Sequence, residues 1–123
     1  MTDNKQELQA VQDACLAIDL KFGKDIVALD IRGLTTVADY FIIATAGSLP
    51  QFQALTAAAE EAFAKHGYKL RHIEGLQSSN WVLMDFGDIF VHIFDKESRQ
   101  FYNLERVWGD SRPLSGLVKS QYE

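Results

Sequence analysis

The residues best suited to acid–base chemistry are Asp85 and His92, which lie on two apolar runs separated by Gly87-Asp88. A two-residue loop of this type closes a tight β-hairpin, and the resulting register sets Asp85 diagonally opposite His92. A carboxylate beside an imidazole can act as a general acid or base. Because no serine or cysteine nucleophile is expected beside them, we interpret the two as a hydrogen-bonded pair in a half-buried surface.

Two other motifs suggest phosphate or metal chemistry. Asp85-Phe86-Gly87 matches the metal-binding triplet of protein kinases, but the chain lacks their glycine-rich loop, lysine strand and catalytic loop. Gly47-Ser48 follows an apolar run, as in a nucleotidyltransferase entry turn or a phosphate-binding helix N-terminus. The paired carboxylates of a transferase do not follow, so Ser48 is predicted to be a helix N-cap. We therefore predict no catalytic residue, cofactor site or metal site.

Large aromatic side chains are concentrated in the last third of the chain. They are Trp81, Phe90, Phe94, Phe101, Tyr102 and Trp108. Such residues either fill a core or anchor an interface, and both interpretations remain open. The nearby Asp85, His92, Arg99 and Glu105 favour an interface, because aromatic rings mixed with a few charges are typical of binding hot spots.

Apolar periodicity predicts the elements that position these residues. The expected strands are 25–31, 40–46, 68–73, 80–86 and 89–94. The expected helices are one with an apolar stripe at Leu8, Val11, Cys15, Ile18 and Phe22, one over 48–66, and one over 99–108 that aligns Phe101, Leu104 and Trp108. The order strand, helix, strand over 40–73 predicts a right-handed parallel crossover. The expected fold is α/β, a single domain with a mixed, partly parallel five-stranded sheet flanked by helices.

The two faces of the expected hairpin differ in composition. One face is wholly apolar and is predicted to belong to the core: Val82, Met84, Phe86, Ile89, Val91 and Ile93. The opposite face carries Trp81, Leu83, Asp85, Phe90, His92 and Phe94. We predict that this second face is a recognition surface.

Length and charge limit the possible classes of protein. The 123 residues suit one domain, expected over 1–112, followed by a polar, flexible tail over 113–123. The net charge is −5 and no third of the chain is basic, so little direct contact with RNA is expected. No run of about 20 apolar residues or signal pattern is found, and Cys15, the only cysteine, permits no internal disulfide or cysteine zinc site. A cytoplasmic location without membrane contact is expected.

Several ordered blocks together resemble the Iojap family, the ribosomal silencing factors, over about residues 5–110. The blocks are DIVALDIRGLTTVADYFIIATAGS with Gln51, then Glu74-Gly75, then WVLMDFGDIFVHIF, then Arg99, Phe101-Tyr102, Leu104-Glu105 and Trp108. Pro50 stands where the family often has a basic residue, and Phe86 where it often has tyrosine. Neither departure falls within the cluster of aromatic and charged residues.

The resemblance implies a non-enzymatic function and a partner. It implies a fold distantly like nucleotidyltransferases without their catalytic carboxylates, and binding to ribosomal protein fourteen of the large ribosomal subunit where the small subunit would dock. Translation would then fall when nutrients are scarce, and homodimerisation away from the ribosome is plausible. A role in large-subunit assembly, a degenerate nucleotidyltransferase, and a dimeric scaffold without a ribosomal partner are the alternatives.

The resemblance and the residue pattern together predict a binding surface for that partner. We expect Trp81, Phe94, Tyr102 and Trp108 to supply apolar area, and Asp85 and Glu105 to face basic side chains of the partner. His92 and Arg99 complete the expected set. This hypothesis requires that the chain's own helices leave the aromatic sheet face open.

Overall fold

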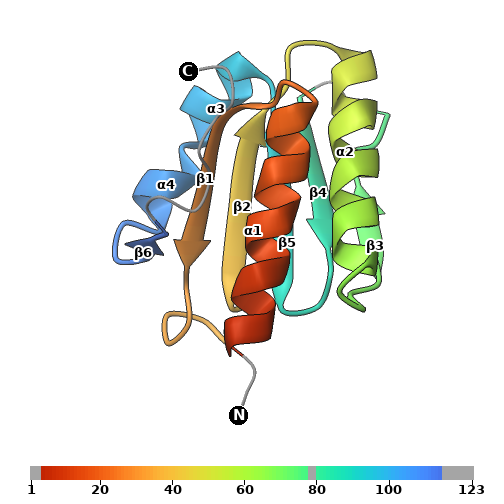
Figure 1. Ribbon diagram of the computed structural model, residues 1–123. Helices are drawn as coiled ribbons and strands as arrows, with labels where there is room; N and C mark the ends of the chain where they lie inside the picture. Colours follow the sequence, from red (N-terminus) through yellow and green to blue (C-terminus); the bar gives the residue numbers. More distant parts are fainter. Residues whose placement is uncertain (1–3, 78–79, 115–123) are drawn as a thin grey trace.

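A computed structural model describes residues 4–77 and 80–114 as one mixed sheet with helices on both faces (Figure 1). The helices are α1 (Asn4–Leu20), α2 (Leu49–Ala64), α3 (Lys96–Tyr102) and α4 (Leu104–Val107). The strands are β1 (Lys24–Asp30), β2 (Tyr40–Thr45), β3 (His72–Glu74), β4 (Trp81–Asp85), β5 (Ile89–Phe94) and β6 (Arg112–Pro113). The predicted α/β class with a mixed sheet is confirmed. Among the helices that the structure describes, none is long and apolar enough to cross a lipid bilayer.

The strands lie in the order β3-β4-β5-β2-β1-β6. Among the strands of the described residues, β2 and β5 are the one parallel pair, and the other neighbours are antiparallel. The crossover through α2 therefore carries the chain from β2 to β3 past two intervening strands, β5 and β4. Strand β3 is also shorter than predicted: it begins at His72, and Tyr68 and Leu70 before it pack against the core.

The sixth strand was not predicted. Arg112 and Pro113 pair with Asp30 and Leu29 at the edge of the sheet, and the Leu114 N–H donates to the Ala28 carbonyl at 2.9 Å. Proline suits this position because an edge strand does not require every backbone donor. The domain boundary expected after residue 112 falls inside this strand, and the rest of the expected tail, 115–123, lies outside the described residues.

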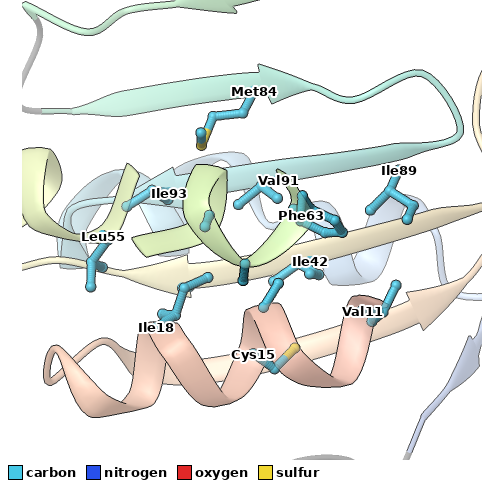
Figure 2. Packing of buried hydrophobic residues seen from close by; sticks show 14 of the residues in the cluster. Val11, Cys15, Ile18, Ile42, Leu55, Phe63, Met84, Ile89, Val91 and Ile93 are labelled. Atoms are coloured by element: carbon cyan, nitrogen blue, oxygen red, sulfur yellow. The ribbon is translucent and has the colours of Figure 1, made fainter. Parts of the chain in front are cut away.

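Helices α1 and α2 cover one face of the sheet with the main core (Figure 1). Figure 2 shows Val11, Cys15 and Ile18 of α1 directed towards the sheet, together with Leu55 and Phe63 of α2. All six hairpin residues predicted to be core are buried. Phe22 is an exception to the predicted α1 stripe: it lies beyond the helix at φ 68° and is 60% exposed. The helix ends first, and the Gly23 N–H donates to the Ile18 carbonyl.

The predicted cap of α2 is confirmed by its hydrogen bonds. The Ser48 hydroxyl accepts from the Gln51 N–H at 3.2 Å, and the Gln51 side-chain oxygen accepts from the Gly47 N–H. The Gln51 amide also donates to the Phe22 carbonyl at 2.8 Å, which joins the start of α2 to the end of α1. Gly47 and Ser48 therefore have a structural role, because their hydrogen bonds with Gln51 cap the start of α2.

Candidate functional site

The sheet face opposite α1 and α2 carries a continuous group of rings, which we call the aromatic face. It comprises Phe41, Trp81, Phe90, His92 and Phe94 of the sheet with Tyr102 and Trp108 of the C-terminal region. The register pairs Trp81 with Phe94, Leu83 with His92, and Asp85 with Phe90, as the sequence predicted. Cross-strand pairs point to the same side of a sheet, so the hairpin turn brings the rings of β4 and β5 together on this face.

The C-terminal region covers the aromatic face only in part. The expected single helix is divided into α3 and α4 by Asn103, which is left-handed at φ 45°. This break places Tyr102 against Trp81, with ring centroids 4.6 Å apart, and Trp108 edge-on to Phe41 at 5.3 Å. Phe101 is 79% exposed, so the expected alignment of Phe101 with Leu104 and Trp108 is wrong.

Exposure divides the predicted site residues into two layers. His92, Phe94 and Arg99 are buried, whereas Trp81, Asp85, Glu105 and Trp108 are half-buried and Tyr102 is 43% exposed. The buried layer supports the accessible one, since the Phe94 ring lies 4.9 Å from that of Trp81 and 6.0 Å from that of Tyr102. The accessible layer is therefore a mixed aromatic and acidic surface.

Arg99 and Glu105 form an internal ion pair. The Arg99 guanidinium donates to Glu105 at 2.7 Å, to the Thr45 hydroxyl at 2.8 Å and to the Asp25 carbonyl at 2.7 Å. Burial opposes ionisation of Glu105, but the hydrogen bond and charge of Arg99 outweigh it and lower the Glu105 pKa. The pair ties α3, α4, β1 and β2 together beside the aromatic face.

The predicted Asp85–His92 pair does not form. Asp85 accepts from the Gly87 N–H at 2.7 Å, which stabilises the hairpin turn. His92 Nδ1 instead accepts from the Trp81 indole N–H at 3.2 Å, while Nε2 is buried and has no hydrogen-bond partner among the described residues. The carboxylate–imidazole pair considered from the sequence is therefore not formed between these two residues.

Burial lowers the pKa of His92 from 6.5 to about 4. Protonation therefore favours the unfolded chain, and the stability present above pH 6.5 is lost progressively as the pH falls towards 4. We expect wild type to lose about 2 kcal/mol more unfolding free energy than His92→Asn between pH 8 and pH 5. Asparagine keeps an acceptor near the Trp81 indole. Urea unfolding at both pH values measures the difference, and equal losses in the two proteins would contradict the assignment.

Phe41 is a member of the aromatic face that our sequence reasoning missed. Its ring centroid lies 4.7 Å from that of His92, 5.3 Å from that of Trp108 and 6.0 Å from that of Phe90. The sequence analysis predicts a buried strand over 40–46 but does not assign its side chains to the two faces of the sheet. Period-two alternation would have separated Phe41 and Ile43 from Tyr40 and Ile42, which face α1 and α2.

The comparisons with known proteins agree over nearly the whole chain. Residues 3–122 match the family model RsfS, described as "Ribosomal silencing factor during starvation". The chain is 42% identical to a ribosomal silencing factor of Bacillus subtilis, over 85% of this chain and 87% of that protein. It is 37% identical to the chloroplastic protein Iojap of Arabidopsis thaliana, over 85% of this chain and 43% of that longer protein.

Two solved structures have the same fold as this chain. A crystal structure of a Chromobacterium violaceum protein superposes with a TM-score of 0.78 at 32% identity, covering 92% of this chain and 93% of that one. A crystal structure of a Bacillus halodurans protein superposes with a TM-score of 0.70 at 35% identity, covering 85% of this chain and 95% of that one. The distant likeness to nucleotidyltransferases remains a prediction. On the sequence match and the shared fold, the chain belongs to the RsfS/Iojap family of ribosomal silencing factors.

Proposed function

We propose that this protein binds the large ribosomal subunit through the accessible part of the aromatic face and thereby blocks joining of the small subunit. The observation that carries the proposal is the partial cover over this face. Trp81 and Trp108 are half-buried and Tyr102 is 43% exposed, and all three lie on the face that contains the buried Phe94. Half-exposed tryptophan and tyrosine anchored in this way are typical of interface hot spots.

Charge at the edges of the face favours a basic protein partner. Asp85 lies beside the hairpin turn, whereas the predicted contact of Glu105 with a partner is weakened because Arg99 already balances its charge. The chain is acidic as a whole, at net −5, so a phosphate backbone would be repelled. We infer that the partner is a protein of the large subunit, and the family resemblance favours ribosomal protein fourteen.

The proposed action requires occupancy and no chemical step. A contact of about 800 Å² per partner is sufficient for a specific complex. A bound domain of 123 residues would then occupy space needed by the incoming small subunit. Repression of translation during nutrient limitation would follow from the fraction of large subunits occupied, and the site of action would be the cytoplasm.

Sedimentation with separated ribosomal subunits tests this function. We expect the protein to move with the large subunit and not with the small subunit in a sucrose gradient. Addition of small subunits to the complex should yield fewer joined ribosomes than addition to bare large subunits. Co-sedimentation without inhibition of joining would favour an assembly factor, whereas absence of co-sedimentation would favour a scaffold. Calorimetric binding of a nucleotide would favour the degenerate transferase.

A further inference from the structure

Three carboxylates from distant parts of the chain meet at one end of the sheet. They are Glu7 in the first turn of α1, Asp39 just before β2, and Asp88 between β4 and β5. One oxygen from each lies within 4.8 Å of the others. Figure 1 shows the start of α1, the start of β2 and the β4–β5 connection together at this end.

Backbone hydrogen bonds hold two of these carboxylates in place. The Asp39 N–H donates to the Asp88 carbonyl at 2.7 Å, and the Tyr40 N–H donates to the same oxygen at 3.2 Å. Glu7 is only 7% exposed, so its carboxylate faces the other two from within the fold. Burial, followed by the charges and hydrogen bonds of Asp39 and Asp88, raises the pKa of Glu7 to about 7. Positive charge placed among the three would relieve this repulsion.

The Tyr40 hydroxyl provides an independent sign of a ligand. Tyr40 has no exposed surface, and its hydroxyl oxygen has no hydrogen-bond partner among the described residues. Burial raises the pKa of Tyr40, and the charges that act on this hydroxyl are, in decreasing order, those of Arg32, Asp30, Glu7 and Asp39. A buried hydroxyl without a partner is unfavourable, so an additional polar group beside the carboxylates would satisfy it.

A basic side chain that feels the charge of Asp39, Arg32, is already paired. The Arg32 guanidinium donates twice to the Asp30 carboxylate, at 2.9 and 2.7 Å, and Arg112 lies 3.1 Å from the same carboxylate. Arg32 also lies 5.4 Å from the centre of the Tyr40 ring. Its charge therefore balances Asp30 first, and the three clustered carboxylates retain an excess of negative charge.

We propose that Glu7, Asp39 and Asp88 bind a hard divalent cation through one carboxylate oxygen each, with a cation-bound water donating a hydrogen bond to the Tyr40 hydroxyl. Carboxylate and water oxygens are the ligands that Ca²⁺ and Mg²⁺ prefer. Mg²⁺ demands near-ideal octahedral geometry and gives up its water reluctantly, whereas Ca²⁺ accepts longer and more variable distances to its oxygens. Ca²⁺ should therefore bind this cluster more tightly than Mg²⁺.

The position distinguishes this site from a nucleotide site. Ligands of open α/β sheets bind beyond the carboxyl ends of parallel strands, where Ser48 follows β2. Asp39 and Asp88 instead precede β2 and β5, the parallel pair, at the amino ends. A cation here would join the first turn of α1 to the sheet and leave the aromatic face unobstructed.

Calorimetry and thermal unfolding of the full chain with CaCl₂ or MgCl₂ alone test the proposal. We expect saturable Ca²⁺ binding with a dissociation constant of about 1 mM or tighter, and a melting temperature that rises with Ca²⁺ by mass action. Asp88→Asn should weaken Ca²⁺ binding at least tenfold, because it removes one charged ligand at an exposed position and keeps the backbone carbonyl. Tyr40→Phe should weaken it several-fold.

Glu60→Gln is the matched control, because Glu60 is an exposed carboxylate on α2 away from the cluster. It should bind Ca²⁺ as wild type does. The proposal is overturned if wild type shows no saturable heat and no thermal shift, or if folded Asp88→Asn binds Ca²⁺ with wild-type affinity. Unchanged affinity in Tyr40→Phe overturns the role given to the hydroxyl.

Discussion

Replacing Tyr102 with serine is expected to weaken binding to the large ribosomal subunit by about 30-fold, the loss typical of an aromatic hot spot. Tyr102 is 43% exposed, and its ring lies against Trp81 at 4.6 Å and Phe94 at 6.0 Å. The ring is thus held in one position before binding, and little conformational entropy is lost when a partner covers it. Titration of labelled protein against purified large subunits measures the change.

Leu20→Ser is the matched control for Tyr102→Ser. Leu20 is 53% exposed at the end of α1, on the other side of the sheet. The Leu20→Ser variant also replaces a large, partly exposed side chain by serine, and it should bind the large subunit as wild type does. If Tyr102→Ser remains folded and binds with wild-type affinity, the aromatic face is not the docking surface.

Asp85→Asn is the suitable test of the acidic edge. Charge reversal to lysine would also remove the acceptor for the Gly87 N–H and so disturb the hairpin turn. Asparagine keeps a side-chain oxygen and removes only the charge. Slower association with the large subunit, and a weaker dependence of that rate on salt, are expected if Asp85 faces a basic partner.

Replacing Arg99 with methionine is expected to lower the free energy of unfolding by about 2–3 kcal/mol. The change leaves the Glu105 carboxylate, the Thr45 hydroxyl and the Asp25 carbonyl without their shared donor. Glu105 is half-exposed and can turn towards water, so the loss should lie at the lower end for a broken buried pair. Urea unfolding measures this loss.

Lys96→Met provides the control for Arg99→Met, since it makes a similar substitution at an exposed position of the same helix. Its unfolding free energy should change by less than about 0.5 kcal/mol. A loss equally small in Arg99→Met would mean that the Arg99 contacts do not stabilise the domain. Arg99→Met should also loosen α4 and thus weaken large-subunit binding through the position of Trp108.

The sequence alone determined the local structure well. The α2 cap at Ser48, the hairpin at Gly87-Asp88 and the register that pairs Trp81 with Phe94 were all predicted and are confirmed. These features depend on residues a few positions apart, where capping bonds, turn conformation and side-chain alternation act directly. For the same reason the core face of the hairpin was identified residue by residue.

Only the tertiary structure decided which strands distant in the sequence are neighbours and how far the aromatic face is covered. The pairing of β2 with β5, the edge strand β6 and the burial of His92 and Phe94 depend on contacts between distant segments. The break at Asn103 turned one expected helix into two and placed Tyr102 and Trp108 over the sheet. Periodicity specifies that a side chain points to one face of a strand, but the burial of that face depends on which distant segment packs against it.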